Sequence, residues 1–145
     1  MNQSESIAKL ATALSIVQGK LSHAKKDSAN PFFKSKYADL ESVWDACRSL
    51  LAENGLAVMQ FPGEFIDGTM SLTTVLTHSS GEWIGQQMSV PISKPDAQGA
   101  GSCLTYMRRY ALAAVVGVVQ ADDDANAAVQ SKSSSSMKSI AKDIL

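Results

Sequence analysis

The sequence has little of what most enzyme sites are built from. Only two cysteines and two histidines occur among its 145 residues, and a structural zinc site needs about four clustered ligands of this kind. It has no Cys-x-x-Cys pair, no P-loop ending in Gly-Lys-Ser/Thr and no Gly-x-Ser-x-Gly elbow. Motifs for ATP hydrolysis and for serine nucleophiles are therefore missing, and we expect a protein without catalytic residues and without a required cofactor.

Long apolar runs are also missing. No stretch approaches the roughly 20 apolar residues that span a bilayer, and the N-terminal MNQSESIAKL lacks the basic and apolar regions of a secretory signal. We expect a cytoplasmic protein that does not contact the membrane. A uniformly basic domain is excluded, because the net charge is −1 and the isoelectric point is about 6.1.

What charge there is has a polarised distribution. Between Lys20 and Lys36 lie five lysines and one acid, Asp27, which gives +5 − 1 = +4 in that segment. Three consecutive aspartates, Asp122, Asp123 and Asp124, stand near the other end of the chain. A local basic surface is therefore compatible with an overall neutral protein.

Hydrophobic periodicity predicts an α+β domain of order ααβββα over residues 1–121. Its parts are a helix over 7–21, a basic loop over 22–36, a helix over 40–53, an antiparallel three-stranded meander over 56–92 and a basic helix over 96–117. We expect the acidic and then Ser-rich residues 122–145 to form a disordered tail. Within this tail the apolar Met137, Ile140, Ala141 and Ile144 have helical spacing, and such a short helix needs a partner surface.

The spacing also predicts which side chains form the core. The first helix has an apolar stripe of Ile7, Leu10, Ala11, Leu14, Val17 and Leu21. The last has one of Ala100, Leu104, Met107, Ala111, Ala114, Val115 and Val118. Gly99 and Gly101 interrupt the start of the last helix, which suggests a close backbone approach, either to the sheet or to a phosphate.

The segment NPFFKSKYADLE interleaves aromatic and basic side chains. Lysines neutralise phosphates and aromatic rings stack on bases, so this pattern is typical of a single-strand binding platform. The candidate single-stranded DNA contacts of this platform are Lys34, Lys36 and Tyr37 in the segment, Lys25 and Lys26 before it, and Lys94 in the loop before the last helix. A second interpretation remains open, in which Phe32 and Phe33 anchor the loop on the core and the lysines are only solvated.

The segment TYMRRYAL is the second candidate. On a helical wheel Arg109 lies in a polar stripe, which favours it as a phosphate ligand, whereas Arg108 lies at the edge of the apolar face. Arg108 is alternatively a structural ion-pair residue. Tyr106 and Tyr110 share one side of the helix, where they stack on bases, pack, or line a subunit interface.

The aspartate triplet is the best candidate for metal chemistry, because carboxylate oxygens are the ligands of Mg²⁺. The triplet lacks partner acids elsewhere in the sequence, so no firm metal site is predicted. Solvation, a basic surface on a neighbouring subunit and a weakly held Mg²⁺ are its three open interpretations.

The segments NPFFKSKYADLESVWDACRSLLAENGLAV, LTTVLTHSSGEWI and KPDAQGAGSCLTYMRRYALAAVVGVVQADDDAN, in this order and spacing, resemble the ERF (essential recombination function) family of phage and prophage single-strand annealing proteins. The resemblance covers roughly residues 5–126. It implies a β-β-β-α core, assembly into rings or helical filaments, and ATP-independent pairing of complementary DNA strands. Lys34, Lys36, Tyr37, Arg108, Arg109 and the aspartate triplet match family blocks.

The resemblance thus implies a homo-oligomer whose partners are single-stranded DNA and the annealed duplex intermediate. A host single-strand binding protein and a phage exonuclease are further partners to consider. Many family members continue into a longer C-terminal region. Functions of that region, such as recruitment of a host protein or control of oligomer size, are therefore less expected here. Two alternatives remain: a protein that coats single strands without annealing them, and, less favoured, a Mg²⁺-dependent nuclease that uses the aspartates.

Overall fold

A computed structural model describes residues 1–24, 28–29 and 36–120, without the side chains of 28–29 and 36–37. Its helices are α1 (Ala8–Lys20), α2 (Leu40–Glu53) and α3 (Ala97–Val116). Its longer strands are β4 (Leu56–Pro62), β5 (Thr69–His78) and β6 (Trp83–Pro91). Two-residue strands are β1 (Asn2–Gln3), β2 (Ser28–Ala29) and β3 (Lys36–Tyr37). The predicted α+β class and the three-helix, antiparallel-meander plan are confirmed.

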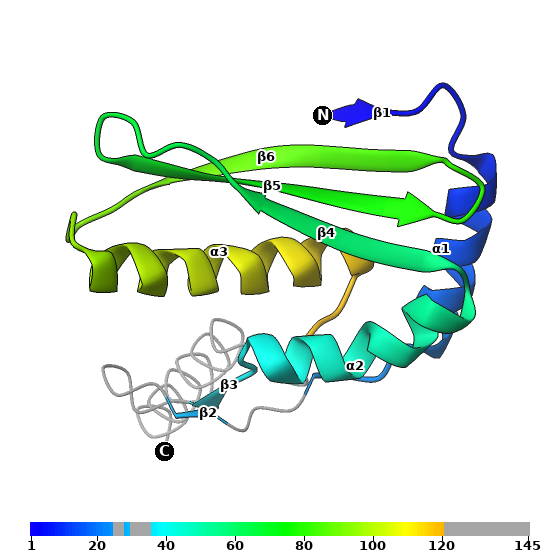
Figure 1. The fold of residues 1–145 in the computed structure, drawn as a ribbon. Coiled ribbons are helices and arrows are strands. Elements are labelled where there is room, and N and C mark those ends of the chain that lie inside the picture. The colour runs from blue at the N-terminus through cyan, green and yellow to red at the C-terminus, as the bar shows by residue number, and fades with distance from the viewer. Residues whose placement is uncertain (25–27, 30–35, 121–145) are drawn as a thin grey trace, which may run out of the picture.

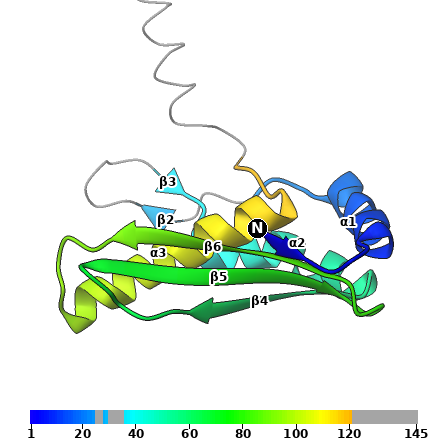
Figure 2. The ribbon, with the colours of Figure 1, turned by 90° about the horizontal axis from the view of Figure 1, so that it is seen from above.

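The main sheet is antiparallel with strand order β1-β6-β5-β4. The three helices lie on one side of it: α3 runs along the strands, α2 packs on α3, and α1 stands at one end (Figures 1 and 2). No described element covers the opposite face of the sheet (Figure 1). Within the described residues, no helix is long and apolar enough to cross a membrane.

Local sequence explains the boundaries of the elements. Asp39 caps α2 by accepting a hydrogen bond from the Ser42 N–H at 2.8 Å. The β4–β5 hairpin turns at Asp67 and Gly68, whose φ angles of 51° and 74° are those of a type I′ turn. In β5 the alternation places Leu72, Thr74 and Leu76 in the core.

Two short pairings were not predicted. The meander gains β1 as a fourth strand, which pairs with Ile84 and Gly85 of β6. The segment expected to be a loop over 22–36 contains β2, which pairs with β3. Two-residue strands leave no periodicity in a sequence, because an alternating pattern needs about four residues before it can be recognised.

The predicted apolar stripes were partly wrong. In α3 the buried side chains are Met107, Leu112 and Val116, whereas Ala114 is exposed. The reason is that α3 packs against the sheet on one side and α2 on another, so its buried arc is wider than a single stripe. In α1 the small side chain of Ala13 is buried and that of Ala11 is exposed.

The core joins all three helices to the sheet. Its fully buried large side chains are Leu10, Val17, Cys47, Leu51, Leu72, Leu76, Met107 and Val116. Burial raises the pKa of the Cys47 thiol to about 11, although its backbone hydrogen bonding acts in the opposite direction. Cys47 therefore behaves as a small apolar side chain, as its place in the helical stripe suggests.

Candidate nucleic-acid interface

An aromatic and basic cluster stands on the exposed side of α3. The ring centroids of Tyr106 and Tyr110 are 4.4 Å apart. The Arg109 guanidinium carbon lies 4.6 Å from the Tyr110 centroid and 5.7 Å from that of Tyr106. Tyr106 and Tyr110 remain 49% and 48% exposed. Their spacing of four residues places both rings on one face of the helix, where they form an aromatic surface open to solvent.

The same cluster alters the pKa of Tyr106. The side-chain hydrogen bond with Tyr110 and then burial raise its pKa above the ordinary value of 10.0, against the opposing charge of Arg109. Tyr106 therefore keeps its hydroxyl proton at neutral pH and can donate a hydrogen bond to a phosphate or a base.

Arg109 also connects α3 to the segment in front of α2. One guanidinium nitrogen donates a hydrogen bond to the Ala38 carbonyl oxygen at 3.1 Å. Ala38 directly follows β3, which contains Lys36 and Tyr37. The two sequence blocks that carry basic and aromatic residues are thus in direct contact, although 71 positions separate the bonded residues.

Both ends of the basic segment are held at the C-terminal end of α3. The Ala24 N–H donates to the Val119 carbonyl at 3.0 Å, and the Ala38 N–H donates to the Gln120 side-chain oxygen at 2.6 Å. Ala24 and Ala38 are almost fully buried, at 2% and 1% exposure. Ala24 and Ala38, which flank residues 25–37 in the sequence, therefore lie at one place beside Val119 and Gln120. We call these ties between Ala24, Ala38, Val119 and Gln120 the loop clasp.

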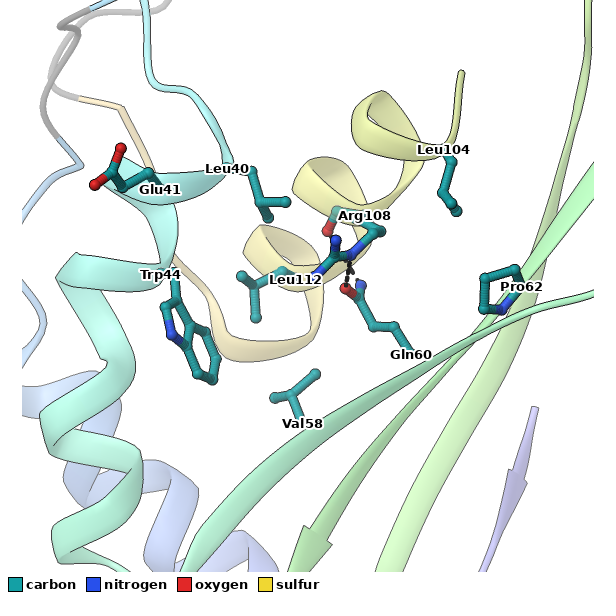
Figure 3. A pocket seen from close by; sticks show the side chains of 9 residues that line it. All are labelled: Leu40, Glu41, Trp44, Val58, Gln60, Pro62, Leu104, Arg108 and Leu112. Carbon is teal, nitrogen blue, oxygen red and sulfur yellow. Dashed lines mark hydrogen bonds between the residues drawn. The ribbon is translucent and has the colours of Figure 1, made fainter. Parts of the chain in front are cut away.

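Arg108, next to Arg109, faces a different surface. It is exposed, and its Nε donates to the Gln60 side-chain oxygen at 3.4 Å, while the Gln60 amide donates to the Arg108 carbonyl at 3.1 Å (Figure 3). The Gln60 amide also lies 3.2 Å from the Thr74 hydroxyl. These bonds join β4 and β5 to the middle of α3 and set the direction of the Arg108 side chain.

Arg108 lines a cavity of about 740 Å³ between α2, α3 and β4. The walls are mostly apolar: Leu40, Trp44, Val58, Pro62, Leu104 and Leu112. Glu41 lies at its edge with the carboxylate turned away from Arg108 (Figure 3). An aromatic wall from Trp44 together with one exposed guanidinium suits a nucleotide, because the ring can stack on a base while the cation meets a phosphate.

The structure separates Lys94 from these residues. Lys94 is exposed before the N-terminus of α3, with its backbone beside Gly99, which lies about 15 Å along the helix from Arg109. Gly99 allows the chain to fold closely there, since a Cβ at this position would overlap the Lys94 carbonyl. Gly99 therefore allows a close backbone approach, but its partner is the Lys94 backbone of the preceding loop and not the predicted sheet. The prediction is wrong at Gly101, where a Cβ would meet open space.

Several predicted site residues lie outside the described part of the chain: Lys25, Lys26, Phe32, Phe33, Lys34, Asp122, Asp123 and Asp124. Lys36 and Tyr37 are described only as backbone of β3. Sequence reasoning missed Trp44, Gln60 and the loop clasp. In the sequence Trp44 shares the helical apolar spacing of Leu40, Val43 and Cys47, which indicates only a core residue. No motif marks alanines or glutamines that act through contacts distant in sequence.

No group of three or more His, Cys, Asp or Glu residues within the described ranges is arranged to hold a metal ion.

The ERF superfamily model matches residues 10–143, nearly the whole chain. The chain belongs to the ERF superfamily. Searches of curated proteins and of solved structures give no match.

ERF membership supports a general role in phage recombination and strand annealing, with single-stranded DNA as the partner. The ERF family is one of DNA-binding annealing proteins rather than classical enzymes. The match also covers the basic segment 22–36, helix α3 and the aspartates at 122–124.

Proposed function

We propose that this protein binds single-stranded DNA and anneals complementary strands without ATP, as a homo-oligomer in phage or prophage recombination. The observation that carries the proposal is the contact between Arg109 and Ala38, with the clasp beside it. It joins a segment of charge +4 to the exposed face of α3 that carries Tyr106 and Tyr110. Phosphate-neutralising and base-stacking groups thus belong to one region.

In this proposal the lysines of residues 25–36 and Arg108 neutralise phosphates, and Tyr106 and Tyr110 stack on bases. Arg109 holds the aromatic surface and the returning basic segment in place. Tyr37 and the nearby Phe32 and Phe33 belong to the same platform. Pairing of the two strands releases its own stacking and base-pairing free energy, so no nucleotide fuel is required.

Oligomerisation reconciles this role with a net charge of −1. One protomer offers only a few phosphate contacts, and these alone give weak, salt-sensitive binding. Several protomers on one strand raise the effective concentration of each site and hold the strand extended. The proposed assembly repeats the basic region along the DNA, whereas most of each protomer's surface remains neutral or acidic.

An annealing assay tests the proposal. Two complementary oligonucleotides that carry a fluorescence donor and acceptor are mixed at low nanomolar concentration with EDTA and without nucleotide. We expect the full-length protein to accelerate energy transfer. Binding without acceleration would contradict annealing and indicate a coating protein. Mg²⁺-dependent loss of labelled strand would instead indicate a nuclease.

Tyr106→Ala provides a residue-level test of the same proposal. If Tyr106 stacks on a base, its loss should weaken single-strand binding by about 1–3 kcal/mol with little dependence on sequence. Tyr106→Phe is the matched control, because it keeps the ring, and should retain most of the affinity. Equal affinity of the alanine variant and the wild-type protein would remove Tyr106 from the stacking surface.

A further inference from the structure

A second cavity, of about 510 Å³, lies on the side of α3 away from α2, between this helix and the β5–β6 half of the sheet. Every side chain that lines it is uncharged: Met1, Leu14, Thr74, Leu76, Ile84, Gly85, Gln86, Gln87, Met88, Tyr110, Ala111, Ala114 and Val115. We call this the apolar groove. A phosphate backbone would meet no cationic side chain in it, so its chemistry fits an apolar segment of protein better than DNA.

The chain that follows the described residues begins beside the apolar groove. Tyr110 and Ala114 line this groove and also the neighbouring cavity, of about 400 Å³, that contains Val119 and Gln120. Gln120 is the last described residue and is fixed by its bond to Ala38. Tyr110 and Ala114 thus separate the apolar groove from Gln120, the residue after which the remaining 25 residues of the sequence follow.

The end of the chain has the pattern that such a groove accepts. Met137, Ile140, Ala141 and Ile144 follow the i, i+3, i+4, i+7 spacing of one helical face, and Lys138, Lys142 and Asp143 fall between them. An isolated helix of this length is unstable in water, so it needs a surface to form on. The connection before it, residues 121–136, can span up to about 53 Å when fully extended. The ERF match extends to residue 143 and so includes most of this segment.

We propose that residues 137–144 dock as a short amphipathic helix in the apolar groove of their own protomer. The apolar stripe faces Leu14, Ile84 and Val115 of the groove, and the two lysines remain in solvent. Docking covers an apolar surface on the monomer and orders the end of the chain without contact to the Arg108 cavity on the other side of α3. The inference concerns a different surface from the proposed DNA interface.

Photo-cross-linking of the full-length protein tests the docking. Benzoylphenylalanine in place of Ile140 is irradiated, and the cross-linked peptides are identified by mass spectrometry. We expect cross-links to residues 84–88 and 110–115. The same group in place of Ser135, in the polar connection, is the position control. A mixture of light and ¹⁵N-labelled protein distinguishes contacts within one chain from contacts between copies.

Two charge variants complete the test. Ala114 is exposed at the edge of the groove, so Ala114→Glu places a carboxylate there without filling the core. We expect it to reduce the groove cross-links by roughly tenfold or more. Ala52→Glu, on an exposed position of α2, is the matched control and should leave them unchanged. Circular dichroism verifies that both variants fold.

Three results would overturn the proposal. The first is a cross-link pattern centred on another surface, such as the uncovered sheet face with Met59 and Phe61. The second is a yield no higher than that of the Ser135 control. The third is groove cross-links found only between light and heavy chains, which would make the groove an interface between copies. The annealing assay measures DNA pairing and none of these cross-links. A failure of the proposed function can therefore be distinguished from a failure of the docking proposal.

Discussion

At the scale of single residues, Arg108 and Arg109 show how neighbours on a helix acquire different roles. The helical wheel favours Arg109 as the phosphate ligand. In the structure Arg109 is half-buried beside the two tyrosine rings and donates to the Ala38 carbonyl. Arg108 is exposed at the first cavity, where its Nε donates to the Gln60 side chain (Figure 3). We therefore propose that Arg108 contacts phosphate and that Arg109 has a positioning role.

Substitution of each arginine separates these roles. Arg109→Ala should lower the free energy of unfolding by about 1–2 kcal/mol, because it removes a charge-assisted hydrogen bond. Arg108→Ala should change stability little, but should lower the log–log salt slope of single-strand binding by roughly 0.7 per protomer, the value for one phosphate contact. Urea unfolding and salt titration of binding measure the two quantities. The opposite assignment holds if only Arg109→Ala lowers the slope.

The two cysteines should differ in reactivity. Cys47 is fully buried with a pKa of about 11, so its thiolate fraction at pH 8 is about 0.1%. Cys103 is only half-buried. A colorimetric thiol reagent should therefore label one cysteine rapidly in the folded protein and both in urea. Rapid labelling of both cysteines under native conditions would show that α2 opens locally.

At the scale of elements, the N-terminus of α1 is capped by a residue that is distant in sequence and lies in the turn between β5 and β6. Its first residue follows Ile7, which provides no side-chain cap. Instead the Glu82 carboxylate, in the β5–β6 turn, accepts a hydrogen bond from the Leu10 N–H at 2.8 Å. A negative charge at a helix N-terminus is also favourable for the helix dipole. Glu82 thus fixes α1 against the end of the sheet.

This cap makes stability depend on pH. Burial alone would raise the pKa of Glu82, but hydrogen bonds from Leu10, Ser6, Ser80 and Lys9 lower it below its ordinary 4.5. Because the folded pKa is the lower one, the contribution is complete above pH 4.5 and disappears as the pH falls through the folded value.

Glu82→Gln should therefore be less stable than the wild-type protein at pH 7, with a difference that shrinks toward about pH 3. Urea unfolding midpoints at both pH values measure this. Glu64→Gln, an exposed glutamate in the β4–β5 connection, is the matched control. A difference that does not vary with pH would exclude the carboxylate charge as its cause.

At the scale of the whole molecule, the loop clasp joins parts of the chain that are more than 80 residues apart. Gln120→Ala leaves the buried Ala38 N–H without its acceptor, which should cost about 1–3 kcal/mol. If the clasp also positions the basic segment, single-strand affinity should fall together with stability. Gln98→Ala, at an exposed position of α3, is the control for both measurements. Unchanged affinity would separate the clasp from DNA binding.

Much of the fold was predictable, and the reason is local. The α2 stripe, the Asp67-Gly68 turn and the alternation in β5 are periodic or conformational signals that act over a few residues. The wider buried arc of α3 was not predictable, because it depends on what packs against the helix. The candidate site divides in the same way. Basic and aromatic residues can be recognised as candidates from their residue type alone. Trp44 and Gln60 become site residues only because they lie beside Arg108 in the folded protein.

The sequence by itself determined the residue types of the interface, its three blocks and the family to which the chain belongs. Those features depend on chemistry and order along the chain. Only the tertiary structure decided that Ala24, Ala38 and Gln120 meet, that Arg109 turns inward and Arg108 outward, and that two cavities, one with the charged Arg108 and one without charged side chains, flank one helix. Such contacts depend on how layers pack, and packing between distant segments leaves no periodic trace in the sequence.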